Sequence, residues 1–258
     1  MTPPIPDYVA PFESTMRMLI TLAALVLIWT GASRMQERAS TRYALAGLLS
    51  AVLIAWVLLA QRLGAANTYL ASTDSQPQSV ALPLALVLPL AFAAGGIWMS
   101  RQVTRLISAI PIWSLVAIQV YRVAGIIFLI LWAAGHLPWQ FALPAGLGDV
   151  ATGFLALPVA ISLHRKTEGA RRATYLWCMF GIADLVVAVT MGMLTSPGPL
   201  HLLALSEPNR IVSAYPLVMI PTFGVPLALV LHGIVLWRLK GSFQESSVAG
   251  APYATQSA

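Results

Sequence analysis

Long apolar stretches, separated by short polar or charged segments, follow one another along almost the whole chain. A helix needs about 20 mostly apolar residues to cross the hydrocarbon core of a bilayer. Seven stretches come close to that length, at residues 16–32, 43–62, 80–100, 111–134, 143–163, 173–194 and 215–237. The pattern therefore predicts an all-α protein, a polytopic transmembrane helix bundle of seven spans over residues 16–238, with tails at 1–15 and 239–258.

The composition supports this prediction. Hydrophobic residues make up 58% of the chain and charged residues 9%, with a mean hydropathy of +0.79. An ordinary soluble domain has about a quarter charged residues. A soluble fold could not remove so much apolar surface from water, so we expect one membrane bundle and no soluble domain. The single cysteine, Cys178, can form no internal disulfide.

The first apolar stretch is the shortest of the seven, because Arg17 and Arg34 bracket it. Its length would also suit a cleaved signal peptide, which begins with a positively charged segment. Here the preceding residues include Asp7 and Glu13 and no Lys or Arg before Arg17. We therefore expect an uncleaved first helix that follows a short extracytoplasmic tail.

The Lys and Arg residues divide unevenly between alternate loops. One set of loops holds 11 of them: Arg34, Arg38, Arg42, Arg101, Arg105, Arg165, Lys166, Arg171, Arg172, Arg238 and Lys240. The other set holds 3: Arg17, Arg62 and Arg210. Cytoplasmic loops carry an excess of Lys and Arg, so we expect the N-terminus outside and the C-terminus in the cytoplasm. The net charge of +6 then reflects orientation rather than nucleic-acid binding, and the expected partners are membrane lipids.

Three ionisable residues interrupt the apolar stretches. Arg122 lies near the middle of the fourth, while Asp149 and Asp184 are the only acids in the fifth and sixth. Ionisable groups at membrane depth are costly and are usually paired or functional. Arg122 and Asp184 are both near mid-membrane, so we expect them to pair. Asp149 lies nearer the outer face, within reach of the long guanidinium directly or through water.

Residues around these three extend the candidate site. Gln119 precedes Arg122 by three positions and shares its helical face. Asp149 lies on a face of otherwise small residues that includes Thr152, which is typical of a helix–helix contact. Two interpretations stay open, a buried ion pair that fixes helix register and a substrate or proton site. The candidate site residues are Arg122, Asp184, Asp149, Gln119, Tyr121, Thr152 and His232.

The segments around the two aspartates resemble each other. Residues 146–153 and 181–188 both place Gly three positions before Asp and a small residue four positions after it. Because the two spans run in opposite directions, this is a short inverted echo, of a kind found at midplane binding sites. Chance similarity between apolar helices is the other explanation.

The seventh stretch carries Pro216, Pro221 and Pro226, with Gly224 between the last two. Proline removes a backbone donor and kinks or breaks a helix. Such breaks are tolerated in membranes where the freed carbonyls face protein or a wet cavity. The stretch is therefore either a kinked helix or one whose outer half is irregular and lines a cavity. His232 lies in its inner half and is a second polar candidate.

The four histidines raise one cofactor question. His136 and His201 fall at the outer edge, and His164 and His232 near the inner edge, as in a two-haem membrane cytochrome. No two of them share a helix at ligand spacing, so we expect no cofactor and no metal, and keep a b-type cytochrome as a minor alternative.

Several classes of protein lack support in the sequence. The only lysines, Lys166 and Lys240, fall in predicted cytoplasmic segments, which excludes a retinal Schiff base inside the bundle. The sequence has no phosphate-binding loop, no His-Glu-x-x-His motif and no Gly-x-Ser-x-Gly motif. An enzyme is therefore less well supported than a binding or transport protein.

Four segments from the fourth stretch onward carry a resemblance to known proteins. They are Gln119-Val120-Tyr121-Arg122, residues 141–149 (FALPAGLGD), residues 196–200 (SPGPL) and the region from Tyr215-Pro216 to His232. With these segments the chain resembles a group of uncharacterised bacterial polytopic inner-membrane proteins. The resemblance covers about half of the chain and implies a location in the bacterial cytoplasmic membrane. It implies no activity.

The sequence thus favours a small transporter or ligand-binding membrane protein with a polar intramembrane site that takes a small molecule or a proton. The main alternative is a structural or accessory subunit whose buried Arg/Asp pair only orders the bundle. A homo-oligomer also stays open, because seven spans without a clear full-length repeat could form a symmetric pathway by dimerising.

Overall fold

The computed structural model describes residues 4–70 and 81–249 of the chain, with side chains described up to Lys240. Within these residues the elements are all helical. Seven segments are long and apolar enough to cross a membrane: Val9–Arg34 (α1), Ala39–Ala65 (α2), Ala81–Met99 (α3), Ile112–Ala133 (α5, η1 and α6), Trp139–Arg165 (α7), Ala170–Thr195 (α8) and Ile220–Lys240 (η2 and most of α9). The predicted seven-span helical bundle is confirmed, and the protein is a multi-pass membrane protein.

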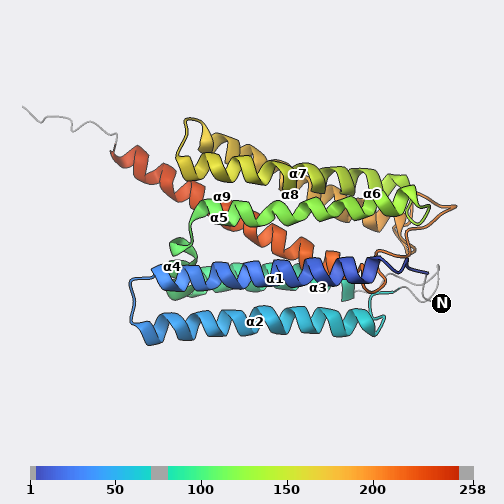
Figure 1. Ribbon diagram of the computed structural model, residues 1–258, viewed down its shortest axis with the longest axis horizontal. Helices are drawn as coiled ribbons and strands as arrows, with labels where there is room; N and C mark the ends of the chain where they lie inside the picture. The colour runs from blue at the N-terminus through green and yellow to red at the C-terminus, as the bar shows by residue number, and fades with distance from the viewer. Residues whose placement is uncertain (1–3, 71–80, 250–258) are drawn as a thin grey trace, which may run out of the picture.

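The helices form two groups that run along the long axis of the molecule (Figure 1). One group contains α1 and α2, and the other contains α5, α6, α7 and α8; α3 lies behind α1 in this view and packs against the seventh span. Helix α9 (Val225–Ala249) runs obliquely between the groups and contacts α3, α5 and α8. Residues from both groups and from α9 therefore meet in the middle of the bundle.

Three boundaries differ from the sequence-based prediction. Helix α1 begins at Val9 rather than at residue 16, which brings Glu13 into the helix. A short helix, α4 (Arg101–Ala109), follows α3 where only a loop was expected, and it buries Leu106 and Ile107. Helix α9 continues to Ala249, so much of the predicted C-terminal tail is helical. The remaining residues of the two tails, 1–3 and 250–258, lie outside the described part of the chain.

The fourth span is not one regular helix. It consists of α5 (Ile112–Ala117), the 3₁₀ helix η1 (Ile118–Gly125) and α6 (Ile126–Ala133). In a 3₁₀ helix, residues three positions apart lie directly above one another. Gln119, Arg122 and Gly125 therefore form one line, and they are the buried residues of η1. A 3₁₀ stretch this long is uncommon inside a helix and often marks a functional segment.

The seventh span begins with a π-helix, η2 (Ile220–Gly224), and residues 211–218 before it form bends and turns. Pro226 has no N–H, so the Thr222 carbonyl lacks the donor that an α-helix would supply from that position. The indole N–H of Trp56 on α2 donates to this carbonyl at 3.2 Å. The irregular outer half that the prolines suggested is present, and a side chain from another span satisfies one of its carbonyls.

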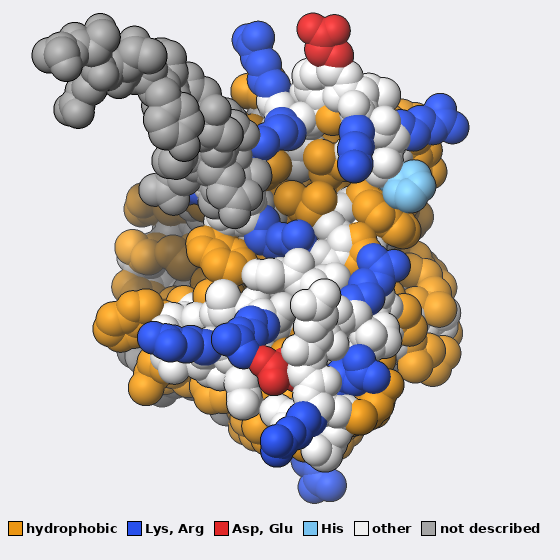
Figure 2. All heavy atoms as spheres, turned by 90° about the vertical axis from the view of Figure 1, so that its left-hand side faces the viewer, with side chains coloured by type: hydrophobic (Ala, Val, Ile, Leu, Met, Phe, Trp, Pro, Cys, Tyr) orange, Lys and Arg blue, Asp and Glu red, His pale blue; other side chains and the backbone are white. Residues whose placement is uncertain are grey.

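One end of the bundle gathers most of the positive charge (Figure 2). This end, the basic end, is formed by the α1–α2 junction, α4, the α7–α8 turn and the last turns of the seventh span. The opposite end, the N-terminal end, contains the start of α1 and the α6–α7 and α8–η2 connections. The charge asymmetry seen in the sequence therefore coincides with the two ends of the folded bundle.

Candidate functional site

Arg122 lies in η1 and its guanidinium contacts three neighbouring helices. Its Nε donates to Oδ1 of Asp149 on α7 at 2.7 Å, and Nη2 lies 2.7 Å from the same oxygen. Nη2 also donates to Oδ2 of Asp184 on α8. Nη1 donates to the Gly181 carbonyl at 3.2 Å and to Nε2 of His232 on α9 at 3.3 Å. A guanidinium has five N–H donors; here four of them make hydrogen bonds, and Nη2 also forms an ion pair with Asp149.

These contacts determine the hydrogen positions on His232. Arginine only donates, so Nε2 of His232 accepts and carries no proton. The proton of the neutral ring is then on Nδ1, which has no hydrogen-bond partner among the described residues. Arg122, Asp149, Asp184 and His232 are called the Arg122 cluster below. With both aspartates ionised, the cluster carries one net negative charge.

The two aspartates differ in their access to the space around them. The Asp184 side chain is 5% exposed and that of Arg122 is 1% exposed, whereas the Asp149 side chain is 15% exposed. The expected ion pair between Arg122 and Asp184 is present. Asp149 also binds the guanidinium of Arg122, and it does so directly. Asp149 is the acid that a ligand can reach.

Glycines leave the space in which the acids meet the arginine. A Cβ atom on Gly148 would overlap the Asp184 carboxylate, and one on Gly125 would overlap Asp149. A Cβ atom on Gly181 would meet the His232 ring. The small residues noted in the sequence therefore allow the helices to approach closely around the Arg122 cluster. They also contribute to helix packing in general.

Two cavities adjoin the Arg122 cluster. The smaller cavity has a volume of about 70 Å³ and lies between α1 on one side and η1, α6 and η2 on the other. The larger cavity has a volume of about 190 Å³, lies among α3, α8 and η2, and extends from Asp149 to Arg210 and Ser213. Asp149 lines both cavities, whereas Arg122 lines only the smaller one.

The space on the other side of the cluster is filled. Buried apolar side chains occupy the bundle between the cluster and the basic end, among them Ala156, Ala160, Cys178, Leu231 and Val235. The Trp177 ring packs against His232 with centroids 4.7 Å apart, and its indole N–H donates to the Thr152 carbonyl at 2.9 Å. The cavities therefore adjoin the cluster on its N-terminal side, and a layer of apolar side chains separates it from the basic end.

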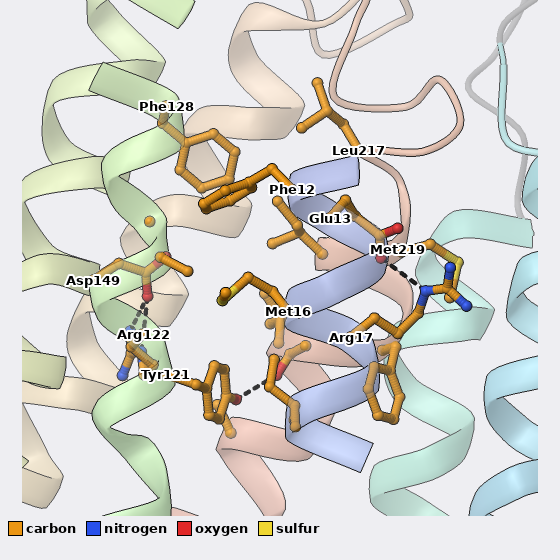
Figure 3. A pocket seen from close by; sticks show the side chains of 18 of the residues that line it. Phe12, Glu13, Met16, Arg17, Tyr121, Arg122, Phe128, Asp149, Leu217 and Met219 are labelled. Atoms are coloured by element: carbon orange, nitrogen blue, oxygen red, sulfur yellow. Dashed lines mark hydrogen bonds and ion pairs between the residues drawn. The ribbon is translucent and has the colours of Figure 1, made fainter. Parts of the chain in front are cut away.

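A second ion pair, Glu13 with Arg17, borders the smaller cavity, and Figure 3 shows it on the side of α1 that faces away from Arg122 and Asp149. Glu13 on α1 accepts from Arg17 Nε at 2.9 Å, and Arg17 Nη1 donates to Gln61 on α2 at 2.7 Å. Glu13 is 5% exposed, and its Oε2 has no hydrogen-bond partner in the described residues. Sequence reasoning missed this pair because it placed Glu13 in the tail, although acid and base four residues apart are typical of a helix face.

Not all of the predicted site residues join the cluster. Gln119 donates to the Ala228 carbonyl at 3.1 Å, and Tyr121 donates to the Gly224 carbonyl at 3.0 Å. Both side chains therefore tie η1 to the seventh span rather than contact the acids. Thr152 is fully buried, and its hydroxyl has no hydrogen-bond partner in the described chain. Of the seven residues, Arg122, Asp149, Asp184 and His232 come together.

The remaining histidines lie away from the cluster. His136 and His201 are in the connections at the N-terminal end, while His164 is near the end of α7 and packs edge-on against Trp113 with ring centroids 5.0 Å apart. Among the described residues, no group of three or more His, Cys, Asp or Glu side chains could hold a metal ion.

Residues 79–240 match a family that is described only as a domain of unknown function, DUF8737. The chain belongs to the DUF8737 family. The DUF8737 region runs from α3 to the seventh span and contains the whole Arg122 cluster, but neither α1 nor α2. It starts one span earlier than the resemblance seen in the sequence. Comparisons with curated proteins and with solved structures gave no match.

Proposed function

We propose that this protein is a small membrane transporter that takes up a proton at the Arg122 cluster through Asp149. The observation that carries the proposal is the balance of charge around Arg122. Two carboxylates share one guanidinium, which makes four hydrogen bonds to protein acceptors and ion pairs with both acids. An incoming anion would have to displace an aspartate, so the free capacity of the site is for a positive charge.

The electrostatic cost of the cluster supports this assignment. An unneutralised charge inside a membrane is expensive, and intramembrane acids commonly bind protons in pumps and transporters. One proton on the two aspartates would make the cluster neutral. The same proton could be replaced by a cation, which is the basis of exchange transport.

Asp149 is the better proton acceptor for geometric reasons. It lines both cavities, while Asp184 lines neither and lies behind the guanidinium. Its Oδ1 binds Arg122, and its Oδ2 lies against Gly125, which also lines the smaller cavity. A proton that enters through the cavities therefore meets Asp149 first, and the arginine links it to Asp184.

The proposal also includes the membrane in which the protein lies and its orientation there. We place the protein in a bacterial cytoplasmic membrane with the basic end toward the cytoplasm, because Lys and Arg concentrate in cytoplasmic loops. Both cavities would then lie on the outer side of the Arg122 cluster. The apolar layer toward the basic end would be the barrier that a transport cycle has to open.

Infrared difference spectroscopy of the purified protein tests the proton site. Stepwise acidification should produce the C=O stretch of a buried protonated carboxyl group. The band should be absent in Asp149→Asn and retained in Asp7→Asn, which removes an exposed acid outside the spans. A spectrum in which no buried carboxyl group titrates, or a band that survives in Asp149→Asn and in Asp184→Asn, would contradict the proposal.

A structural or accessory subunit is the second candidate function. The observation that favours it is the way Arg122 joins η1, α7, α8 and α9 through direct bonds, as expected of a pair that orders a bundle. In that case the cluster should keep one protonation state across the pH range in which the protein is folded. The infrared titration therefore separates the two functions.

A further inference from the structure

The larger cavity connects the Arg122 cluster with the N-terminal end of the bundle, and most of its wall has no role in the proton site proposed above. Among the described residues that line it, two are charged, Asp149 and Arg210. Asp149 belongs to the Arg122 cluster, whereas Arg210 lies in the connection between α8 and η2 at the N-terminal end (Figure 1). The cavity therefore has a positive group of its own, away from the Arg122 cluster in the chain.

Arg210 lies where basic residues are rare. Lys and Arg concentrate at the basic end (Figure 2), and the orientation of the chain in the membrane does not account for a positive charge at the other end. A guanidinium binds a carboxylate through two parallel hydrogen bonds. Arg210 is exposed, unlike Arg122, so an anion can reach it without displacing an aspartate.

Arg210 and an aromatic ring border the same end of α8. The N–H of Asn209, the residue before Arg210, donates to the Thr195 carbonyl at 2.9 Å. The Phe141 ring lies against Gly192, where an added Cβ atom would be 3.6 Å from it. Gly192 and Thr195 are three residues apart, which is about 4.5 Å along a helix. The arginine segment and the ring are therefore neighbours on the cavity wall.

The apolar part of the wall suits a further ring. Phe141 packs edge-on against Phe128 with ring centroids 5.2 Å apart, and both line the cavity. Val212, two residues after Arg210, belongs to the same buried apolar cluster as these rings. Aromatic rings pack well edge-to-face or offset. The volume is about 190 Å³, and a cavity of about 150 Å³ holds benzene, so one ring with a small substituent fits.

We propose that the larger cavity binds a small aromatic carboxylate, whose carboxylate group binds Arg210 and whose ring lies in the apolar part of the cavity. The charge of Arg210 selects the anion, and the size of the cavity selects a single ring. This inference rests on the proposed transport function and names the class of its substrate. The carboxylate binds at Arg210, while the proton binds at Asp149 in the same cavity.

The shared cavity makes binding of the carboxylate depend on the proton. The titratable and charged side chains that contact Asp149 or Arg122, or share a cavity with Asp149, are Arg122, Asp184, His232, Tyr121, Glu13, Arg17, Arg210 and Tyr69. A proton on Asp149 removes a negative charge that repels the bound carboxylate. Above about pH 5, where a carboxylic acid in water stays ionised, binding should strengthen as the pH falls through the range in which the infrared band appears.

Equilibrium binding of radiolabelled benzoate to the purified full-length protein tests the inference. We expect one saturable site with an affinity about 10- to 100-fold lower in Arg210→Gln, which loses charge-assisted hydrogen bonds. Arg62→Gln, at an exposed position of the same end, should bind like the parent. Benzyl alcohol, which has the ring without the charge, and acetate, which has the charge without the ring, should both compete more weakly than benzoate.

A second pair of variants tests the cavity itself. Ala188→Phe fills part of the space and should abolish saturable binding of benzoate, because Ala188 lines the cavity. Ala183→Phe, at an exposed position of the same helix, should bind like the parent. Helical circular dichroism of each sample shows whether the variant is folded.

Several outcomes would overturn the inference. They are the absence of saturable benzoate binding, equal binding in the parent, Arg210→Gln and Ala188→Phe, and tighter binding of benzylammonium than of benzoate. Displacement of benzoate by a lower concentration of palmitate would also overturn it, since the cavity would then hold a lipid acyl chain. A titrating infrared band without benzoate binding leaves the proton site in place and removes the ligand. Benzoate binding that requires Arg210 without a titrating band supports the ligand and removes the proton site.

Discussion

Replacing Arg122 should destabilise the bundle far more than replacing either aspartate. Arg122→Gln leaves the Asp149 and Asp184 carboxylates buried together without a counter-charge, and it removes the donors to Gly181 and His232. Removing one partner of a buried ion pair costs about 3–5 kcal/mol. We expect a loss in that range, reduced where the acids take up protons.

The aspartate variants differ because the cluster has one acid more than it has bases. In Asp184→Asn the excess negative charge disappears, Arg122 keeps Asp149, and the amide oxygen can still accept from the guanidinium. Removal of the excess negative charge therefore offsets the free energy that is lost with the Arg122–Asp184 ion pair. We expect a loss of about 1 kcal/mol, the net value of a typical hydrogen bond.

The measurement is the free energy of unfolding in mild detergent, followed by helical circular dichroism as a denaturing detergent is added. Arg101→Gln, at an exposed position of the basic end, serves as the control and should stay within about 0.5 kcal/mol of the parent. If Asp184→Asn costs as much as Arg122→Gln, the cluster has no excess negative charge, and the reasoning behind the proton site fails.

Three further substitutions test other parts of the structure. Gly148→Ala places a methyl group against the Asp184 carboxylate and should lower the free energy of unfolding by about 1–3 kcal/mol. The control Gly47→Ala, where the space is open, should leave it unchanged. Equal effects of the two substitutions would contradict the close approach of Gly148 and Asp184. Trp56→Phe leaves the carbonyl freed by the helix break without its indole donor and should cost about 1–3 kcal/mol; an unchanged free energy would show that this bond is unimportant. Burial raises the pKa of the Tyr69 hydroxyl above its usual value near 10, so the unfolded state loses this proton first and stability should fall as the pH rises above about 10. Tyr69→Phe should flatten that alkaline slope, and a slope that stays the same would assign it to other groups.

The spans were predictable because a bilayer imposes a length and an apolar composition on any helix that crosses it. The meeting of Arg122 with Asp149 and Asp184 was predictable for a related reason, since isolated charges at that depth need partners. In both cases the environment leaves few alternatives, so a single sequence carries enough information.

The other half of the cavity was missed because its signals are weaker. Glu13 lies before the most apolar part of α1, and a hydropathy pattern assigns it to a tail. The four-residue spacing from Glu13 to Arg17, with Gln61 on the antiparallel α2, was the available sign. Acid–base pairs at this spacing also occur on many exposed helices, which makes the sign difficult to interpret alone.

The roles of Gln119 and Tyr121 could not be predicted for a different reason. Their partners are backbone carbonyls of Ala228 and Gly224, and a carbonyl has no side-chain identity that a sequence pattern could mark. The 3₁₀ geometry of η1, which sets the directions of both side chains, also has no sequence signature of its own here.

The boundary of the DUF8737 region at residue 79 divides the smaller cavity between two parts of the chain. The charged cluster comes from inside the region, while the facing wall with Glu13 comes from α1, before it. Membership of the DUF8737 family therefore describes only one wall of this cavity. The charge centre belongs to the family region, and the helix that closes the cavity over it does not.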